Sequence, residues 1–272
     1  MTSLVADTWE RGNPYERYIG RWSRRVAPQF LDWLAVPARR TWVDVGCGTG
    51  ALCATILDRC HPRTVTGIEP SQGFLDVAAE ALHGRAALRI GNATSLPLGD
   101  ATADAVVSGL VLNFVPDLSA AMKEMSRVAV PGGTVAAYVW DYAGRMELIR
   151  RFWDLASSLD PAASLLHEGT RFPICQPDAL RAAFADAGLN AVEVTALDTV
   201  AVFTDFDDYW QPFLGGQGPA PAYAMSLDED RRARLRDGLR MSLPHDASGT
   251  ITLDARAWAV RGTRSPIARK TS

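Results

Sequence analysis

Residues 43–50, which read VDVGCGTG, constrain the fold of this chain more than any other feature. The run follows a short β-branched stretch at 41–45 and opens a helical pattern at 51–60, so it predicts a strand, a tight loop and a helix. Glycines at this position let backbone amides approach a ligand at the carboxyl end of a parallel sheet. A nucleotide-like cofactor is therefore expected. Gly46, Gly48 and Ala51 also satisfy the loose dinucleotide spacing G-x-G-x-x-G/A, so the loop by itself does not name the cofactor.

The rest of the chain alternates β-branched runs with helical patterns, which predicts repeated βα units around a parallel sheet. Further strands are expected at 64–69, 87–92 and within 103–112, and a fifth opens after the Pro-Gly-Gly turn at 131–133. Helices are expected at 51–60, 71–82, 118–130 and 177–189. Two more strands, 191–200 and 249–260, complete the pattern. A length of 272 residues fits one α/β domain with elaborations.

Two segments extend this core. Residues 15–34 read as an amphipathic helix or helix pair, with an apolar stripe of Tyr18, Trp22, Val26 and Phe30. Residues 201–248 interrupt the last two strands, and an insertion of that length predicts a lid or cap. It carries two expected helices, 205–214 and 227–241, joined by the loop GGQGPAPA at 215–222. The tail after Arg264 is expected to be loose.

Composition excludes several classes of function. The formal net charge of −3 gives no basic field for a nucleic-acid backbone. Only Lys123 and Lys270 are lysines among the 28 basic residues, which leaves little room for lysine-dependent chemistry. The four cysteines form no C-x-x-C pair and have no histidine cluster, so free thiols and no metal site are expected. The apolar runs are too short for a membrane span and no signal peptide is visible, so a cytoplasmic location is expected.

Four motifs in order resemble those of class I S-adenosylmethionine-dependent methyltransferases, and specifically the branch related to quinone-biosynthesis enzymes (methyltransferase type 11). Asp44, Gly46, Gly48 and Gly50 match the acid-x-G-x-G-x-G motif. In GIEPS, Glu69 falls at the family's ribose-binding acid. In GNATSLPLGDATADAVVSG, Asn92 and Ala93 fall where the family meets the adenine edge. EMSRVAVPGG is similar to the family's stop before the fifth strand. The resemblance covers residues 15 to about 140 well and the last two strands more loosely.

The resemblance implies a Rossmann-like fold, with a seven-stranded, mostly parallel sheet, helices on both faces and an antiparallel last strand. The expected domains are an N-terminal helical lid at 1–38, a core at 39–200 and 249–263, an acceptor-site cap at 201–248 and a tail at 264–272. The implied cofactor is S-adenosylmethionine. The residues expected to bind it are Tyr18, Trp22, Asp44, Gly46, Cys47, Gly48, Gly50, Glu69, Pro70, Asn92, Ala93 and Leu110. Tyr18 and Trp22 either close over the methionine end or belong to the buried stripe of the first helix.

Methyl transfer is an in-line displacement at a carbon that the sulfonium already activates, so alignment and exclusion of water supply much of the rate. The sequence SGLVLNFVPD after the fourth strand lacks the N/D-P-P-Y/F/W pattern of amino-directed DNA and protein methyltransferases. A small organic acceptor, methylated at O, N or C, is therefore expected. The oligomeric state is not predicted.

Candidate residues for the acceptor side are few. His167, Asp141 and Tyr142 are possible general bases, with a solvated loop histidine as the alternative for His167. Trp140, Tyr142, Phe172 and Trp210 are expected as aromatic walls, and Gln217 as a polar contact. Trp210 also lies at helical spacing with Phe206 and Phe213, which fits a packed helix face equally well.

Two other functions stay open. A nicotinamide-dependent oxidoreductase could use the same glycine loop. The short-chain class of these enzymes needs a Tyr-x-x-x-Lys pair, which is missing here, because Ser119 and Pro266 stand where the tyrosine would precede Lys123 and Lys270. A protein of the same fold could also bind S-adenosylmethionine without transferring a methyl group, because methyltransferases need no obligatory catalytic side chain.

Overall fold

A computed structural model describes residues 20–215 and 218–266. The chain divides into two compact units. The sheet unit comprises the described residues 23–139, 174–197 and 258–266, and the helical unit comprises 20–22, 140–173, 198–215 and 218–257. Residues 140–173 thus group with the insertion, whereas the sequence analysis assigned them to the core. Within the described part of the chain, no helix is both long and apolar enough to cross a membrane.

Seven strands form one mixed sheet in the order β3-β2-β1-β4-β5-β7-β6. β1 pairs in parallel with β2 and β4, β2 with β3, and β4 with β5, while the last strands run antiparallel. The predicted fold class is confirmed. The strands are β1 (Thr41–Val45), β2 (Thr64–Glu69), β3 (Ala87–Ile90), β4 (Ala103–Gly109), β5 (Ala129–Trp140), β6 (Leu189–Phe203) and β7 (Ile251–Arg264).

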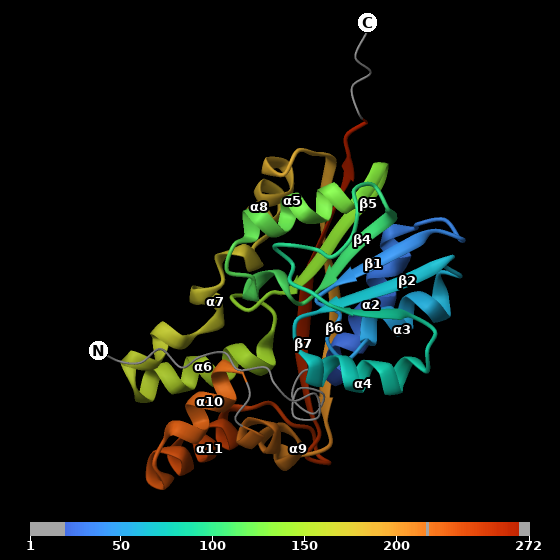
Figure 1. The fold of residues 1–272 in the computed structure, drawn as a ribbon. Coiled ribbons are helices and arrows are strands. Elements are labelled where there is room, and N and C mark those ends of the chain that lie inside the picture. Colours follow the sequence, from blue (N-terminus) through green and yellow to red (C-terminus); the bar gives the residue numbers. More distant parts are fainter. Residues whose placement is uncertain (1–19, 216–217, 267–272) are drawn as a thin grey trace, which may run out of the picture. The chain divides into compact units, whose positions relative to one another are not determined.

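Helices cover both faces of the sheet unit. α3 and α4 lie together on one face, and α5 and α8 lie on the opposite face (Figure 1). Arg59 on α3 pairs with Asp32 on α2 at 2.8 Å, which places α2 beside α3. The helices are α2 (Arg21–Leu34), α3 (Ala51–Arg59), α4 (Gln72–Leu82), α5 (Leu118–Val128) and α8 (Pro177–Asp186), with a 3₁₀ turn η2 (Leu112–Phe114) after β4.

Burial explains why the central strands read as continuous apolar runs. Trp42, Val43 and Val45 of β1 are all buried, because helices cover both faces of a parallel sheet. The stripe predicted on the first helix is also buried: Val26 and Phe30 of α2 are fully enclosed, and Phe30 packs on Tyr138 of β5 with ring centroids 4.8 Å apart. The described members of this stripe, Trp22, Val26 and Phe30, are thus buried, while Tyr18 lies outside the described residues.

The start of β5 corrects one expectation. The Pro-Gly-Gly turn does not precede the strand, because β5 already begins at Ala129. Ala103 pairs with Ala129 and Ala105 with Thr134, so residues 130–133 form a bulge inside the strand. A Cβ on Gly133 would lie 2.8 Å from the carbonyl oxygen of Val130, so the bulge requires glycine there. Proline and glycine are tolerated in a strand at such a bulge.

An aromatic core holds the helical unit together. The rings of Phe152 and Phe213 stack at 4.6 Å with an interplanar angle of 4°, and the buried Tyr209 hydroxyl donates to the Leu148 carbonyl oxygen at 3.1 Å. The elements are α6 (Glu147–Leu159), η3 (Pro161–Leu166), α7 (Glu168–Arg171), η4 (Pro173–Cys175, which ends in the sheet unit), α9 (Phe206–Trp210), η5 (Gln211–Gly215), α10 (Pro219–Ser226) and α11 (Glu229–Ser242).

The second half of the predicted GGQGPAPA loop is helical. α10 begins at Pro219, directly after Gly218, whose φ is +88°. Proline suits the first turn of a helix because its fixed φ is already helical and its missing N–H would have no partner there. The proline-rich sequence therefore begins a helix instead of shaping a loop. Residues 216–217, including Gln217, and residues 1–19, including Tyr18, lie outside the described part of the chain.

Candidate cofactor site

The loop between β1 and α3 carries the predicted glycines. The amides of Gly46 and Cys47 both donate to the Ile68 carbonyl oxygen, at 2.8 and 3.0 Å, which ties the loop to the end of β2. A Cβ on Gly46 would lie 2.6 Å from the Val111 side chain, whereas one on Gly48 would meet nothing within 4 Å. Both glycines have positive φ, +73° and +52°. Packing against Val111 thus requires glycine at position 46. Gly48 instead borders open space, which is what a loop that holds a ligand needs.

Glu69 ends β2 beside this loop. Its carboxylate accepts from the Gly48 amide through Oε2 and from the Ser71 amide through Oε1, both at 3.1 Å. Burial raises the pKa of Glu69, and the two amides partly oppose that rise. A carboxylate offers about four acceptor sites, so each oxygen keeps a lone pair for a further donor. Glu69 therefore holds the loop in shape and can still accept a ligand hydroxyl.

Asp44 lies on β1 beneath the loop and is almost fully buried. The Cys53 thiol donates to its Oδ2 at 3.2 Å, and Oδ1 has no partner. Burial raises the pKa of Asp44 to about 7, with the charge of Glu69 adding to the rise and the Cys53 hydrogen bond opposing it. Contact with Cys47 and burial raise the pKa of the Cys53 thiol. Asp44 is thus an acid with one uncompensated oxygen.

Asn92 and Ala93 follow β3, at the next strand end along the sheet. The side-chain Oδ1 of Asn92 accepts from the amide and the hydroxyl of Thr94, at 3.0 and 3.1 Å, which makes a local turn. Asn92 is exposed, and so is Pro70 after β2. Their amide and ring surfaces face outward at this edge and stay predicted cofactor contacts.

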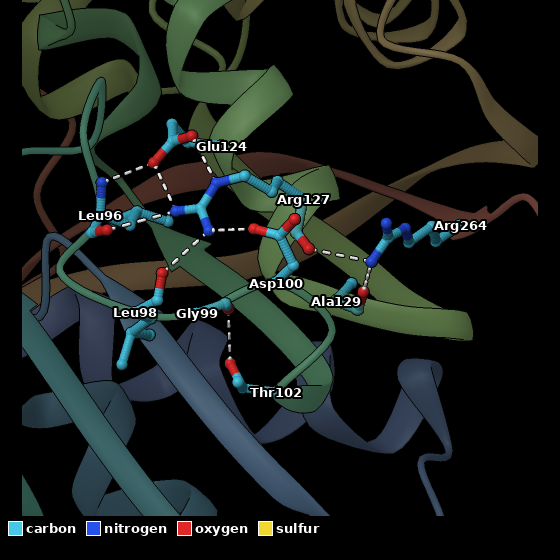
Figure 2. A network of polar contacts seen from close by, with 9 residues as sticks. All are labelled: Leu96, Leu98, Gly99, Asp100, Thr102, Glu124, Arg127, Ala129 and Arg264. Carbon is cyan, nitrogen blue, oxygen red and sulfur yellow. Dashed lines mark hydrogen bonds and ion pairs between the residues drawn. The ribbon is translucent and has the colours of Figure 1, made fainter. Parts of the chain in front are cut away.

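A polar network fixes the segment that follows Asn92 (Figure 2). On α5, Glu124 and Arg127 form a bidentate pair at 2.7 and 2.8 Å. Glu124 also accepts from the Leu96 amide at 2.7 Å, and Arg127 donates to the carbonyl oxygens of Leu96 and Leu98 at 3.2 and 2.8 Å. Asp100 accepts a further bond from Arg127 at 2.7 Å. The connection between β3 and β4 is thereby attached to α5.

The turn after β4 completes this edge of the sheet. Leu110 has a φ of +63°, and its amide donates to the Tyr138 carbonyl oxygen at 2.8 Å. Val111 packs against Gly46, as noted above. Asn113 on η2 is 9% exposed, and neither atom of its amide group has a hydrogen-bond partner. Nothing in the sequence pattern singled out Asn113, although an amide within the apolar run LVLNFV is the signal that could have done so.

Five predicted ligand contacts lie in the helical unit, and all are buried side chains. Tyr142 and Phe172 pack with ring centroids 5.9 Å apart, and Trp210 stacks near Phe213 at 5.9 Å. Trp22 meets Phe203 edge-on at 5.2 Å. Trp140 is also enclosed. The packing of Trp210 agrees with its alternative interpretation as a packed helix face, and the roles of all five toward a ligand stay predictions.

The candidate bases are engaged in backbone turns. His167 caps α7, because its Nδ1 accepts from the Gly169 amide at 2.9 Å, and burial lowers its pKa. The lone pair that a base would use is therefore occupied. Asp141 Oδ2 accepts from the Arg145 amide at 3.0 Å, and a Cβ on Gly144 would collide with this carboxylate. Both geometries favour structural roles.

No group of three or more His, Cys, Asp or Glu side chains that could hold a metal ion occurs among residues 20–215 and 218–266. The four cysteines are free thiols.

Comparison with known proteins found relatives for the part of the chain that carries this edge of the sheet. Residues 43–137, from β1 through most of β5, match the family model described as a methyltransferase domain. Over these residues the chain is similar to that family. An uncharacterized methyltransferase of Mycobacterium tuberculosis is 34% identical over 133 residues, 49% of each chain. The demethylmenaquinone methyltransferase of Bacillus licheniformis is 36% identical over 108 residues, 39% of this chain and 47% of the relative.

The match to curated relatives spans about half of their length. Among solved structures, phosphoethanolamine N-methyltransferase 2 of Haemonchus contortus, in complex with S-adenosyl-L-methionine, superposes with a TM-score of 0.54 at 14% identity, covering 91% of this chain and 53% of that one. That likeness concerns the fold. The predicted resemblance to methyltransferases of the quinone-biosynthesis branch is confirmed for residues 43–137.

Proposed function

We propose that this protein transfers the methyl group of S-adenosylmethionine to a small organic acceptor. The observation that carries the proposal is the pairing of Gly48 with Glu69. The Gly48 amide is fixed by the Glu69 carboxylate at 3.1 Å, and the position of its absent Cβ borders open space. A carboxylate placed beside an open glycine is suited to a ribose whose hydroxyls donate hydrogen bonds.

The surrounding residues fit this cofactor better than a phosphate-bearing one. Positions 44–50, 69–70, 92–93 and 110–113 contain no lysine or arginine, and they include two buried acids, Asp44 and Glu69. An acid at the end of the second strand serves the ribose of a dinucleotide as well, so the discriminating residue is Asp44, beneath the glycine loop. Its ionised form repels a pyrophosphate and attracts a ligand with a sulfonium and an ammonium group. The unpartnered Oδ1 of Asp44 is a suitable acceptor for the ammonium group.

The chemistry then makes modest demands on the protein. The bound cofactor supplies a methyl carbon activated by its sulfonium leaving group. The glycine loop and Glu69 position the cofactor, and the protein aligns the acceptor and excludes water from it. The loop is already ordered by bonds to Ile68 and Glu69, so little of the binding free energy is used to shape it.

A small organic acceptor is the finer part of the proposal. The net charge of −3 and the absence of an N/D-P-P-Y/F/W pattern after β4 argue against nucleic acid. A relative that methylates demethylmenaquinone, by its name, supports a small aromatic acceptor. The acceptor atom, O, N or C, is left to experiment.

Mass spectrometry of the reaction mixture tests the proposal. The full-length protein is incubated with S-adenosylmethionine and a panel of quinols, phenols and amines, with Glu69→Ala as the control for spontaneous methylation. We expect S-adenosylhomocysteine and one methylated panel compound in equal amounts with the wild type, and strongly reduced amounts with the control. If S-adenosylhomocysteine binds tightly but no member of a broad panel is methylated, a non-methyltransferase role on the same fold replaces the proposal.

A further inference from the structure

The side-chain amide of Asn113 is buried without a partner. Its side chain is 9% exposed, and both Oδ1 and Nδ2 are enclosed and make no hydrogen bond. Leaving a buried amide unpaired costs the full free energy of removing its polar atoms from water. Buried polar groups are nearly always paired in folded proteins, so an unpaired one at the ligand edge of a sheet points to a missing partner.

The position of Asn113 in the sheet suggests which partner is missing. Across the carboxyl edge, the strand order β3-β2-β1-β4 places Asn92, Glu69, the glycine loop and η2 in that sequence. The resemblance assigns Asn92 to the adenine and Glu69 to the ribose. S-adenosylmethionine laid along this edge in the same direction brings its amino-acid end to the β1 and β4 side. Val111, two residues before Asn113, already contacts the loop at Gly46.

We propose that the Asn113 amide donates a hydrogen bond to the carboxylate of the cofactor's amino-acid end, beside the ammonium group that the proposed function already gives to Asp44 Oδ1. Asp44 lies on β1, and Asn113 lies on η2, just beyond the adjacent strand β4. Their unpartnered atoms match the ammonium group and the carboxylate of an amino acid, respectively. This inference deepens the proposed function and rests on it.

A neutral amide is suited to this place. A lysine or arginine beside Asp44 would pair with that acid and withdraw it from the ammonium group, whereas an amide donates to a carboxylate without neutralising Asp44. An amide also carries no charge to be buried in the absence of cofactor, so the cofactor-free fold tolerates it.

Calorimetric titration with two ligands tests the inference. S-adenosylhomocysteine carries the amino-acid end, and 5′-methylthioadenosine carries the same nucleoside and sulfur without it. Full-length wild type, Asn113→Leu and Asn113→Asp are compared, since leucine removes the amide at similar volume and aspartate replaces the donor by a negative charge. Asn190→Leu is the matched control, because Asn190 is exposed and donates to Ser265.

We expect Asn113→Leu to bind S-adenosylhomocysteine at least tenfold more weakly, Asn113→Asp more weakly still, and both to bind 5′-methylthioadenosine within twofold of wild type. Without ligand, the melting temperature of Asn113→Leu should equal or exceed that of wild type, because a buried unpaired amide has been removed. Unchanged affinity for S-adenosylhomocysteine, an equal loss for both ligands, or a lower ligand-free melting temperature would each overturn the inference. Failure of wild type to bind S-adenosylhomocysteine would instead contradict the proposed function.

Discussion

At the scale of single residues, Glu69 has one observed task and one proposed task. It accepts from two backbone amides of the loop region and is proposed to accept the ribose hydroxyls. Glu69→Ala should weaken S-adenosylhomocysteine binding by about 2 kcal/mol or more, the scale of charge-assisted hydrogen bonds lost from an enclosed site. Glu69→Gln keeps one oxygen acceptor and should lose less. Calorimetry measures both, with Asp76→Ala on the exposed face of α4 as the acidic control. Equal affinities for Glu69→Ala and wild type, with the fold intact, would refute the ribose role.

Asp44 should make cofactor affinity depend on pH. With its pKa raised to about 7 by burial, Asp44 changes from mostly neutral to mostly ionised as the pH rises through that value in the cofactor-free protein. A ligand ammonium group favours the ionised acid, so S-adenosylhomocysteine affinity should rise as the pH increases through 7 and flatten above it. Asp44→Asn should abolish that rise, and titrations from pH 6 to 8 compare the two. A parallel rise in the variant would place the titrating group elsewhere.

The ionisation of Asp44 should lower the stability of the fold as the pH rises, whereas it should raise the affinity for the cofactor. Because burial raises the pKa of Asp44 above its value in the unfolded chain, the folded state binds this proton more tightly. The contribution of Asp44 to stability is fully present below the unfolded pKa of about 4 and is lost as the pH rises through about 7. Ligand-free wild type should therefore lose more stability between pH 5 and 8 than Asp44→Asn, as measured by urea unfolding.

At the scale of elements, α5 controls the segment between β3 and β4. Arg127 links two carbonyl oxygens and two carboxylates, whereas Arg59 on α3 makes one exposed ion pair with Asp32. Arg127→Ala should cost about 2 kcal/mol, because the part-buried Glu124 and the carbonyl oxygens of Leu96 and Leu98 lose their charged donor. Arg59→Ala should cost no more than about 0.5 kcal/mol.

Hydrogen exchange distinguishes this positioning role from general destabilisation. Arg127→Ala should lose amide protection first in residues 92–100, and its affinity for S-adenosylhomocysteine should fall because Asn92 and Ala93 are held less rigidly. Uniform loss of protection across the sheet unit would show that Arg127 only supports global stability.

At the scale of the whole molecule, the sequence predicted helices and strands best where glycines and helix caps mark their ends. The βαβα run from β1 to α4 is marked by glycines, apolar strands and the Ser71 cap, so its elements fall close to their predicted bounds. The bulge at 130–133 and the helix at Pro219 depend on pairing and packing that local signals do not carry. The Arg127 network joins residues about 30 positions apart, and the unpaired amide of Asn113 is visible only once burial is known. These features lie beyond a single-sequence pattern.

The central claim, that this edge of the sheet binds S-adenosylmethionine and not a dinucleotide, is tested most directly by calorimetric titration of the full-length protein. Parallel titrations use S-adenosylhomocysteine and NAD under the same conditions. The account predicts saturable heat with S-adenosylhomocysteine and none with NAD, because the buried acid Asp44 beneath the glycine loop disfavours a pyrophosphate. Saturable heat with NAD and none with S-adenosylhomocysteine would contradict it.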